Sequence, residues 1–147
     1  MVVKLEQNES VNEIEVKITH NAEDKNVDRI LSLLKTLDDK IECHLENRLK
    51  LINVSDIYYI ESLNNETLIF SENNKYKTKL RLYQLIEKLG DSGFIQISKY
   101  CIININKLDS VRPLFNSRME VKLVNGVRLD VTRKYLNGLK QIYFEDE

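Results

Sequence analysis

Residues 57–71 read IYYIESLNNETLIFS, and this stretch decides the fold. Two runs rich in isoleucine, tyrosine, leucine and phenylalanine flank Asn64-Asn65. Asparagine tolerates a left-handed backbone, so such a pair is typical of a tight turn between strands. The stretch therefore predicts a β-hairpin, and residues 48–53 and 75–80 on either side predict further strands.

The remainder of the chain after this hairpin continues the same β-rich texture. Leu82, Leu85, Ile86 and Leu89 recur every three or four residues, which predicts a short helix. Residues 94–98 and 102–105 predict two more strands. Asn125-Gly126 is a strong turn signal between residues 119–124 and 127–131, and residues 133–141 predict a closing helix.

The residues before position 48 show a different organisation. Residues 13–18, EIEVKI, alternate strictly between charged and apolar side chains, which predicts a strand. Residues 23–38 predict an amphipathic helix, and residues 41–45 alternate again. We therefore predict a small β-α-β extension at residues 1–47, followed by the main domain at residues 48–147. The helix has one apolar face that could pack on its own domain or bind a partner: Val27, Ile30, Leu31, Leu34 and Leu37.

Charge is distributed unevenly along the 147 residues, although the net charge is only −1. Residues 1–47 contain 6 basic and 11 acidic side chains, whereas residues 48–147 contain 16 and 12. Three of those acids, Glu145, Asp146 and Glu147, end the chain. Anion binding is therefore expected in the second part, although an ordinary surface with uneven charge gives the same totals.

Motifs for catalysis and metal binding are missing from the sequence. Both histidines, His20 and His44, precede residue 48, and the two cysteines, Cys43 and Cys101, lie far apart. No glycine-rich phosphate loop, nucleophile elbow or metal-binding pattern is found. We expect neither an enzyme nor a cofactor, a metal or a small-molecule substrate. No apolar run approaches the roughly 18 residues of a membrane helix, and no secretory signal is evident, so a cytoplasmic protein is expected.

Four segments in this order resemble the LytTR-type DNA-binding domain of bacterial transcription regulators. They are Asp56-Ile57-Tyr58-Tyr59-Ile60-Glu61-Ser62, the helix at 82–89, Phe94-Ile95-Gln96-Ile97-Ser98-Lys99 with Ile102-Ile103-Asn104, and Asn125-Gly126 with Leu129-Asp130-Val131-Thr132-Arg133-Lys134-Tyr135. The resemblance covers residues 52–142. It implies an α+β, mostly β fold, an elongated arrangement of small antiparallel sheets with one or two short helices.

The resemblance also implies that loops, rather than a recognition helix, enter successive major grooves of duplex DNA. Its contact regions correspond here to the turn with Asn64, Asn65 and Thr67, to Ser98 and Lys99, and to Arg133 with Lys134 beside it. Independently, a period-two row in residues 75–81 suits phosphate contacts, or protection of a strand edge: Lys75, Lys77, Lys79 and Arg81. Tyr100 and Glu66 depart from the family pattern.

We expect from these features a sequence-specific regulator that binds promoter repeats, as a homodimer at least on DNA. Family members without a receiver domain are often restrained by a small membrane protein, which adds a second candidate partner. The alternative is a protein-interaction module that keeps the fold with little DNA binding. A small enzyme using carboxylates is a third hypothesis, and it requires acidic side chains that converge in a pocket.

Overall fold

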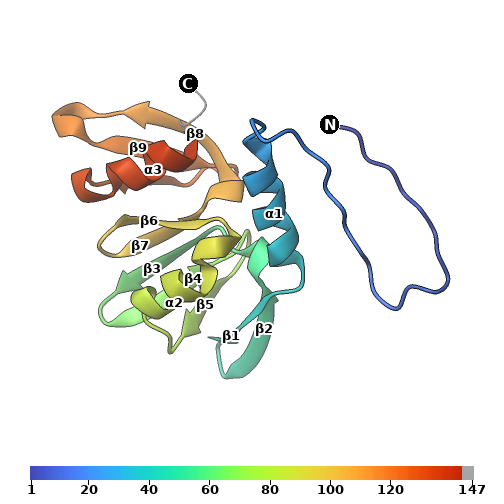
Figure 1. Cartoon of the computed structure of the whole chain (residues 1–147). Coiled ribbons are helices and arrows are strands. Elements are labelled where there is room, and N and C mark those ends of the chain that lie inside the picture. Colours follow the sequence, from blue (N-terminus) through green and yellow to red (C-terminus); the bar gives the residue numbers. More distant parts are fainter. Residues whose placement is uncertain (144–147) are drawn as a thin grey trace.

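A seven-stranded antiparallel sheet forms the larger part of the molecule (Figure 1). The structure is a computed structural model that describes the backbone of residues 1–143 and the side chains of residues 1–141. The strand order is β2-β1-β5-β4-β3-β7-β6. The bounds are β1 Lys40–Leu45, β2 Arg48–Asn53, β3 Tyr59–Leu63, β4 Glu66–Phe70, β5 Lys75–Thr78, β6 Phe94–Ser98 and β7 Cys101–Asn104.

A three-stranded sheet and three helices complete the fold. The small sheet has the order β10-β9-β8, with β8 Leu108–Pro113, β9 Met119–Leu123 and β10 Arg128–Val131. The helices are α1 Asn26–Leu37, α2 Leu82–Leu89 and α3 Leu136–Tyr143. Short 3-10 turns connect several elements, among them η1 Val54–Asp56 between β2 and β3 and η2 Gly90–Ser92 between α2 and β6.

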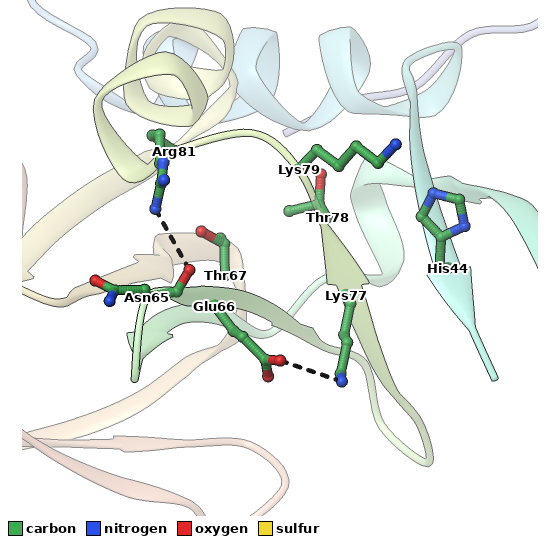
Figure 2. Close-up of a pocket in the computed structure, with 8 residues that line it drawn as sticks. All are labelled: His44, Asn65, Glu66, Thr67, Lys77, Thr78, Lys79 and Arg81. Carbon is green, nitrogen blue, oxygen red and sulfur yellow. Dashed lines mark hydrogen bonds and ion pairs between the residues drawn. The ribbon is translucent and has the colours of Figure 1, made fainter. Parts of the chain in front are cut away.

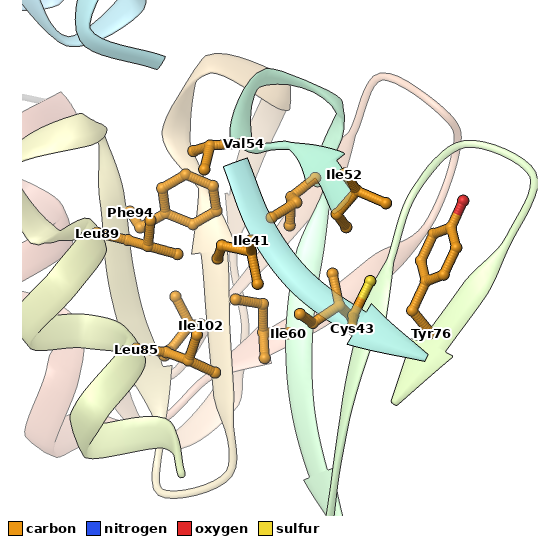
Figure 3. Close-up of a cluster of buried hydrophobic side chains, with 12 residues drawn as sticks. Ile41, Cys43, Ile52, Val54, Ile60, Tyr76, Leu85, Leu89, Phe94 and Ile102 are labelled. Atoms are coloured by element: carbon orange, nitrogen blue, oxygen red, sulfur yellow. The ribbon is translucent and has the colours of Figure 1, made fainter. Parts of the chain in front are cut away.

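One face of the large sheet packs beneath α2 and forms the first hydrophobic cluster (Figure 3). Side chains alternate between the two faces of a strand, so every second residue of β1, β3, β4 and β5 points into this cluster. Isoleucines make up half of it, and Leu85 and Leu89 of α2 cover one side of it. Its buried members are Ile41, Cys43, Ile52, Val54, Ile57, Ile60, Ile69, Tyr76, Leu85, Leu89, Phe94 and Ile102.

The opposite face of β6 and β7 packs against the small sheet and α3, which forms the second cluster. Its buried members are Ile95, Ile97, Cys101, Ile103, Ile105, Val121, Val131, Leu136 and Leu139. Asn104, only 1 % exposed, connects neighbouring segments because its Nδ2 donates to the Ile57 carbonyl at 2.8 Å and its Oδ1 accepts from the Asn106 N–H at 3.0 Å. Strands β6 and β7 contribute side chains to both clusters, since Phe94 and Ile102 belong to the first and Ile95 and Ile103 to the second.

The β-rich architecture with few short helices is confirmed. The hairpin at Asn64-Asn65 forms with Leu63 opposite Glu66, and Gly126 adopts a φ of 90° in the β9–β10 turn. The predicted helix at 23–38 is observed as α1.

The predicted strand at residues 13–18 is wrong, because these residues have no regular structure. Figure 1 shows residues 1–25 as an extended trace beside α1 and away from both sheets. Ile14 is 92 % exposed and no neighbouring strand satisfies its backbone. Alternation alone does not make a strand, because the N–H and C=O groups need a partner strand.

The predicted strand at 41–45 is observed, but it belongs to the large sheet. β1 pairs with β2 over six residue pairs, from Lys40 opposite Asn53 to Leu45 opposite Arg48, and it meets β5 at His44 opposite Lys77. The sheet therefore continues across the expected boundary between residues 47 and 48, and the predicted β-α-β unit does not form.

The apolar face of α1 is only partly covered. Val27, Ile30 and Leu34 are half-buried, whereas Leu31 and Leu37 are exposed. The helix contacts η1 and η2, and its Thr36 is buried. Part of the predicted partner-binding face therefore packs on the protein's own domain.

Candidate nucleic-acid interface

Main-chain hydrogen bonds bring the three predicted contact regions to one end of the large sheet. The Ser62 N–H donates to the Tyr100 carbonyl at 2.8 Å, which places the β3–β4 turn beside the β6–β7 turn. The Thr132 N–H donates to the Ile97 carbonyl at 3.0 Å, which places the end of β10 beside the end of β6. We call this the contact end.

Arg133 is the contact-end residue whose guanidinium is most clearly oriented. It begins a short 3-10 turn after β10 and is exposed. Its Nε donates to the Asn116 carbonyl at 2.8 Å, whereas its two Nη groups make no hydrogen bond within residues 1–141. The guanidinium is thus fixed on one edge and free on the edge that can bind guanine O6 and N7.

Ser98 and Lys99 lie where β6 turns into β7. A bulge between Gln96 and Ser98 precedes the turn, and the Ser98 Oγ accepts from the Tyr100 N–H at 3.3 Å. The Lys99 Nζ lies 5.5 Å from the centre of the exposed Tyr100 ring. The hydroxyl is therefore engaged in the turn, while the lysine remains at the surface and available to an anion.

Lys134 has a similar setting beside Arg133. Its Nζ lies 5.6 Å from the centre of the Tyr135 ring, and the lysine itself is exposed. The pair adds positive charge to the contact end without an acidic partner among the ion pairs of the described residues.

The turn residues Asn64 and Asn65 have φ angles of 53° and 64°. Both side chains are exposed. The left-handed backbone explains why asparagine stands at these positions, independently of any ligand. Their amide groups are nevertheless carried on the β3–β4 turn, which belongs to the contact end.

A basic groove of about 480 Å³ extends from this turn along β5 (Figure 2). Lys77, Lys79 and Arg81 line it, together with His44, and Arg81 Nη1 donates to the Asn65 carbonyl at 3.4 Å. Glu66 is its one acidic lining residue and lies 3.4 Å from the Lys77 Nζ. This exposed pair has little energetic weight, so the groove keeps a positive charge.

Thr67 is a predicted contact residue whose side chain is almost fully buried, although it lines the basic groove (Figure 2). It lies opposite Thr78 on the face that α2 covers and is only 4 % exposed. Glu66 stands at the exposed start of β4, whereas Thr67, Leu68 and Ile69 are all buried. We therefore exclude Thr67 from the contact residues proposed below.

Neither cysteine is a reactive group. Burial, with a smaller contribution from Glu61, raises the pKa of the Cys101 thiol to about 12. Burial also raises the pKa of Cys43, against a smaller opposing effect of Lys50. Both sulfurs are therefore neutral thiols at physiological pH, as expected of small buried side chains.

Other chemistry is not built into the described part of the chain. Within residues 1–141, no three histidine, cysteine or acidic side chains gather where they could hold a metal ion. None of the helices described is both long and apolar enough to cross a membrane. The acidic residues Glu145, Asp146 and Glu147 lie outside the described residues.

Sequence reasoning missed the residues around the β8–β9 turn. Asn116 and Arg118 precede Arg133 by more than a dozen positions, so no local pattern connects them with it. The signal that could have found them is the pairing of residues 119–123 with 108–113, which places a turn at 114–118. Basic side chains therefore gather on turns at one end of the sheet, a setting that suits contacts with the phosphates of a nucleic acid.

Comparison with known proteins agrees with this interpretation. The family profile of the LytTr DNA-binding domain matches residues 47–143. A solved structure of a LytTr DNA-binding domain from Bacillus cereus has the same fold, with a TM-score of 0.68 over 71 % of this chain and 96 % of that one, at 19 % identity. The chain therefore belongs to the LytTR DNA-binding domain family.

Relatives of two lengths are similar to the chain. Sensory transduction protein LytT of Enterococcus faecalis is 30 % identical over 65 % of this chain and 40 % of its own length. The chain spans about half of Transcriptional regulatory protein LytR of Staphylococcus aureus, at 27 % identity. An uncharacterized HTH-type transcriptional regulator of Staphylococcus aureus is 29 % identical over 90 % of this chain and 92 % of its own length.

Proposed function

We propose that this chain is a transcriptional regulator that binds specific sequences in duplex DNA through the contact end. It acts without catalysis, in the cytoplasm, and requires no cofactor or small-molecule substrate. Phosphate contacts supply most of the affinity and a few base contacts supply the specificity. The names of the similar LytT and LytR proteins support a regulatory role.

The observation that carries the proposal is the setting of Arg133. One edge of its guanidinium is held by the Asn116 carbonyl at 2.8 Å, so little side-chain entropy is lost when the other edge binds. Bidentate pairing of arginine with guanine is the commonest specific contact in the major groove. Lys99 lies on the neighbouring turn and suits either guanine or phosphate.

The remaining contact residues have separate roles in this proposal. Asn64 and Asn65 offer amides that match adenine N6 and N7. Lys77, Lys79 and Lys134 bind phosphates beside the bases, and Ser98 orders the turn that carries Lys99. The basic groove in Figure 2 gives the phosphate backbone a path along β5.

The protein binds as a homodimer on repeated sites, because one such module reads few bases. A single DNA-binding module buries about 600–1,000 Å² of protein surface, which limits its specificity. The exposed Leu31 and Leu37 of α1 suit contact with a second copy or another protein. The acidic charge of residues 1–47 would keep this region away from DNA.

The experiment that tests the proposal is fluorescence anisotropy with the intergenic DNA upstream of the protein's own gene and with a scrambled control. Both are titrated at two salt concentrations. Tighter binding to the natural sequence, weakening steeply with salt, is the expected result. Equal weak binding to both probes would favour the protein-interaction module, whose supporting observation is the exposed part of α1.

A further inference from the structure

The β8–β9 turn carries a phenylalanine whose side chain is exposed to solvent. Phe115 is 91 % exposed, which makes it the most exposed aromatic side chain within residues 1–141. The next residues, Asn116 and Ser117, have φ angles of 64° and 60°. A left-handed backbone is unfavourable for serine, and an exposed phenyl ring is poorly hydrated. The fold itself gains no packing from this ring.

The turn is nevertheless held in one shape. The Leu114 N–H donates to the Arg118 carbonyl at 2.9 Å and closes the loop. The Asn116 carbonyl, one residue after the ring, accepts from the Arg133 Nε at 2.8 Å. Phe115 is therefore part of the same rigid unit as the guanidinium that we propose to read guanine.

Charge surrounds the ring with the sign that DNA requires. Arg118 follows it in the turn, and its Nη1 lies 3.8 Å from the Asp130 Oδ2, which is a weak exposed pair. Arg133 donates to the carbonyl of Asn116, the residue that follows the ring. An apolar group between two arginines is unsuited to a purely apolar protein surface, but it suits a DNA groove in which phosphates flank the base edges.

We propose that Phe115 contacts the C5 methyl group of a thymine next to the guanine bound by Arg133. This inference rests on the proposed function. The thymine methyl is the apolar group that base pairs present in the major groove, and phenylalanine is among the side chains that contact it. Phe115 then reads thymine against cytosine at a position that the polar side chains of the contact end do not distinguish.

Removal of the methyl group itself tests this contact. A DNA fragment that the full chain selects from a random-sequence pool is prepared with thymidine or with deoxyuridine, which lacks only the C5 methyl. Affinities of the wild-type protein and of Phe115→Ala are measured by anisotropy on both forms. We expect the wild-type protein to bind the deoxyuridine form about fourfold more weakly for each contacted methyl. In Phe115→Ala the ratio of the affinities for the thymidine and deoxyuridine forms should be about fourfold smaller than in the wild-type protein.

Tyr83→Ala is the matched control, because Tyr83 is an exposed aromatic residue on α2, at 69 % exposure. This variant should keep the wild-type ratio between the two DNA forms. An unchanged ratio in Phe115→Ala, with wild-type affinity for the thymidine form, would overturn the inference and leave the proposed function intact. Failure of the full chain to select any sequence would overturn the proposed function, and this contact with it.

The sequence contains no tryptophan, so Phe115→Trp provides a direct second readout. Its fluorescence should become protected from acrylamide quenching when the selected DNA is added. The indole of the Tyr83→Trp control should remain as accessible to acrylamide with bound DNA as without it. Equal quenching of Phe115→Trp with and without bound DNA would contradict the contact even if the alanine variant had lost stability.

Discussion

The two ends of the large sheet share the same strands but differ in charge. The contact end carries a groove of about 480 Å³ lined by Lys77, Lys79 and Arg81, with Glu66 as its acidic residue. The opposite end, at the turn 71–74, carries a groove of about 340 Å³. That groove is lined by Lys50 and Lys107 but also by Asp56 and Glu72.

The difference shows that charge, and not architecture, distinguishes the two ends. Both have tight turns with asparagine, and both have exposed polar side chains. In the far groove two acids line the same surface as the two lysines, and these acids, Glu72 and Asp56, also raise the pKa of the buried Tyr58 in addition to the effect of burial. A polyanion would therefore prefer the contact end, and the variants below test this preference.

The largest effect is expected when the frame common to both ends is weakened. Ile102 of β7 is fully buried in the first cluster (Figure 3), and Ile102→Ala should lower the free energy of unfolding by about 2–5 kcal/mol. Urea denaturation followed by circular dichroism measures this. Ile14→Ala is the control, because Ile14 is 92 % exposed and its replacement should change stability by less than about 0.5 kcal/mol.

A change at Arg133 should have the next largest effect, on binding alone. Arg133→Ala should weaken binding to the selected DNA sequence by about 1–3 kcal/mol, while binding to random DNA should change much less. Anisotropy on both probes measures this. Arg128→Ala, at the opposite end of β10, is the matched control. Equal losses on the two probes would assign Arg133 to a phosphate contact or to support of the β8–β9 turn.

The turn asparagines allow the backbone role to be separated from the amide role. Asn65→Gly keeps the positive φ but removes the side chain. We expect normal thermal unfolding together with a loss of about 1 kcal/mol in specific binding, the low end for a lost base contact. Unchanged affinity would mean that Asn65 only forms the turn.

Lysine substitutions compare the two ends directly. Lys79→Gln should weaken binding to the selected and to random DNA to a similar extent. It should also reduce the slope of log K against log salt concentration by about 1. Lys50→Gln, in the far groove, should leave the slope unchanged. A slope that falls equally in both variants would remove the distinction between the ends.

The smallest effect near neutral pH concerns the cysteines, one in each hydrophobic cluster. The folded pKa of Cys101 is raised from about 9 to about 12 by burial, so folded and unfolded chains both hold this proton below pH 9. Above pH 9 the unfolded chain releases the proton first, so the free energy of unfolding should fall as pH rises from 9 to 12. Denaturation at pH 7 to 10 measures this, and Cys101→Val should have a shallower pH dependence.

Local patterns predicted the elements whose partners are close in sequence. The Asn64-Asn65 and Asn125-Gly126 hairpins, α1 and α2 follow from turn residues and from periodicity. Residues 13–18 have the same alternation as a true strand, yet no neighbouring strand pairs with them. A pattern describes the side chains, whereas a strand also needs a backbone partner, which the pattern does not identify.

The residues of the candidate site could be predicted from the sequence better than their arrangement in space. The basic side chains were found from period and resemblance, but the bonds that gather them join distant residues, such as Thr132 with Ile97. The burial of Thr67 depends on which face α2 covers, which no local rule supplies. The exposure of Phe115 likewise depends on the pairing of β8 with β9.

The hydrogen bonds that assemble the contact end come from the main chain. Ser62 with Tyr100 and Thr132 with Ile97 are joined through N–H and carbonyl groups that every residue except proline retains on mutation. The side chains presented to a ligand can therefore change one at a time while their mutual positions persist. Substitutions at the contact end can therefore alter the groups that a ligand meets while the backbone frame that positions them is kept.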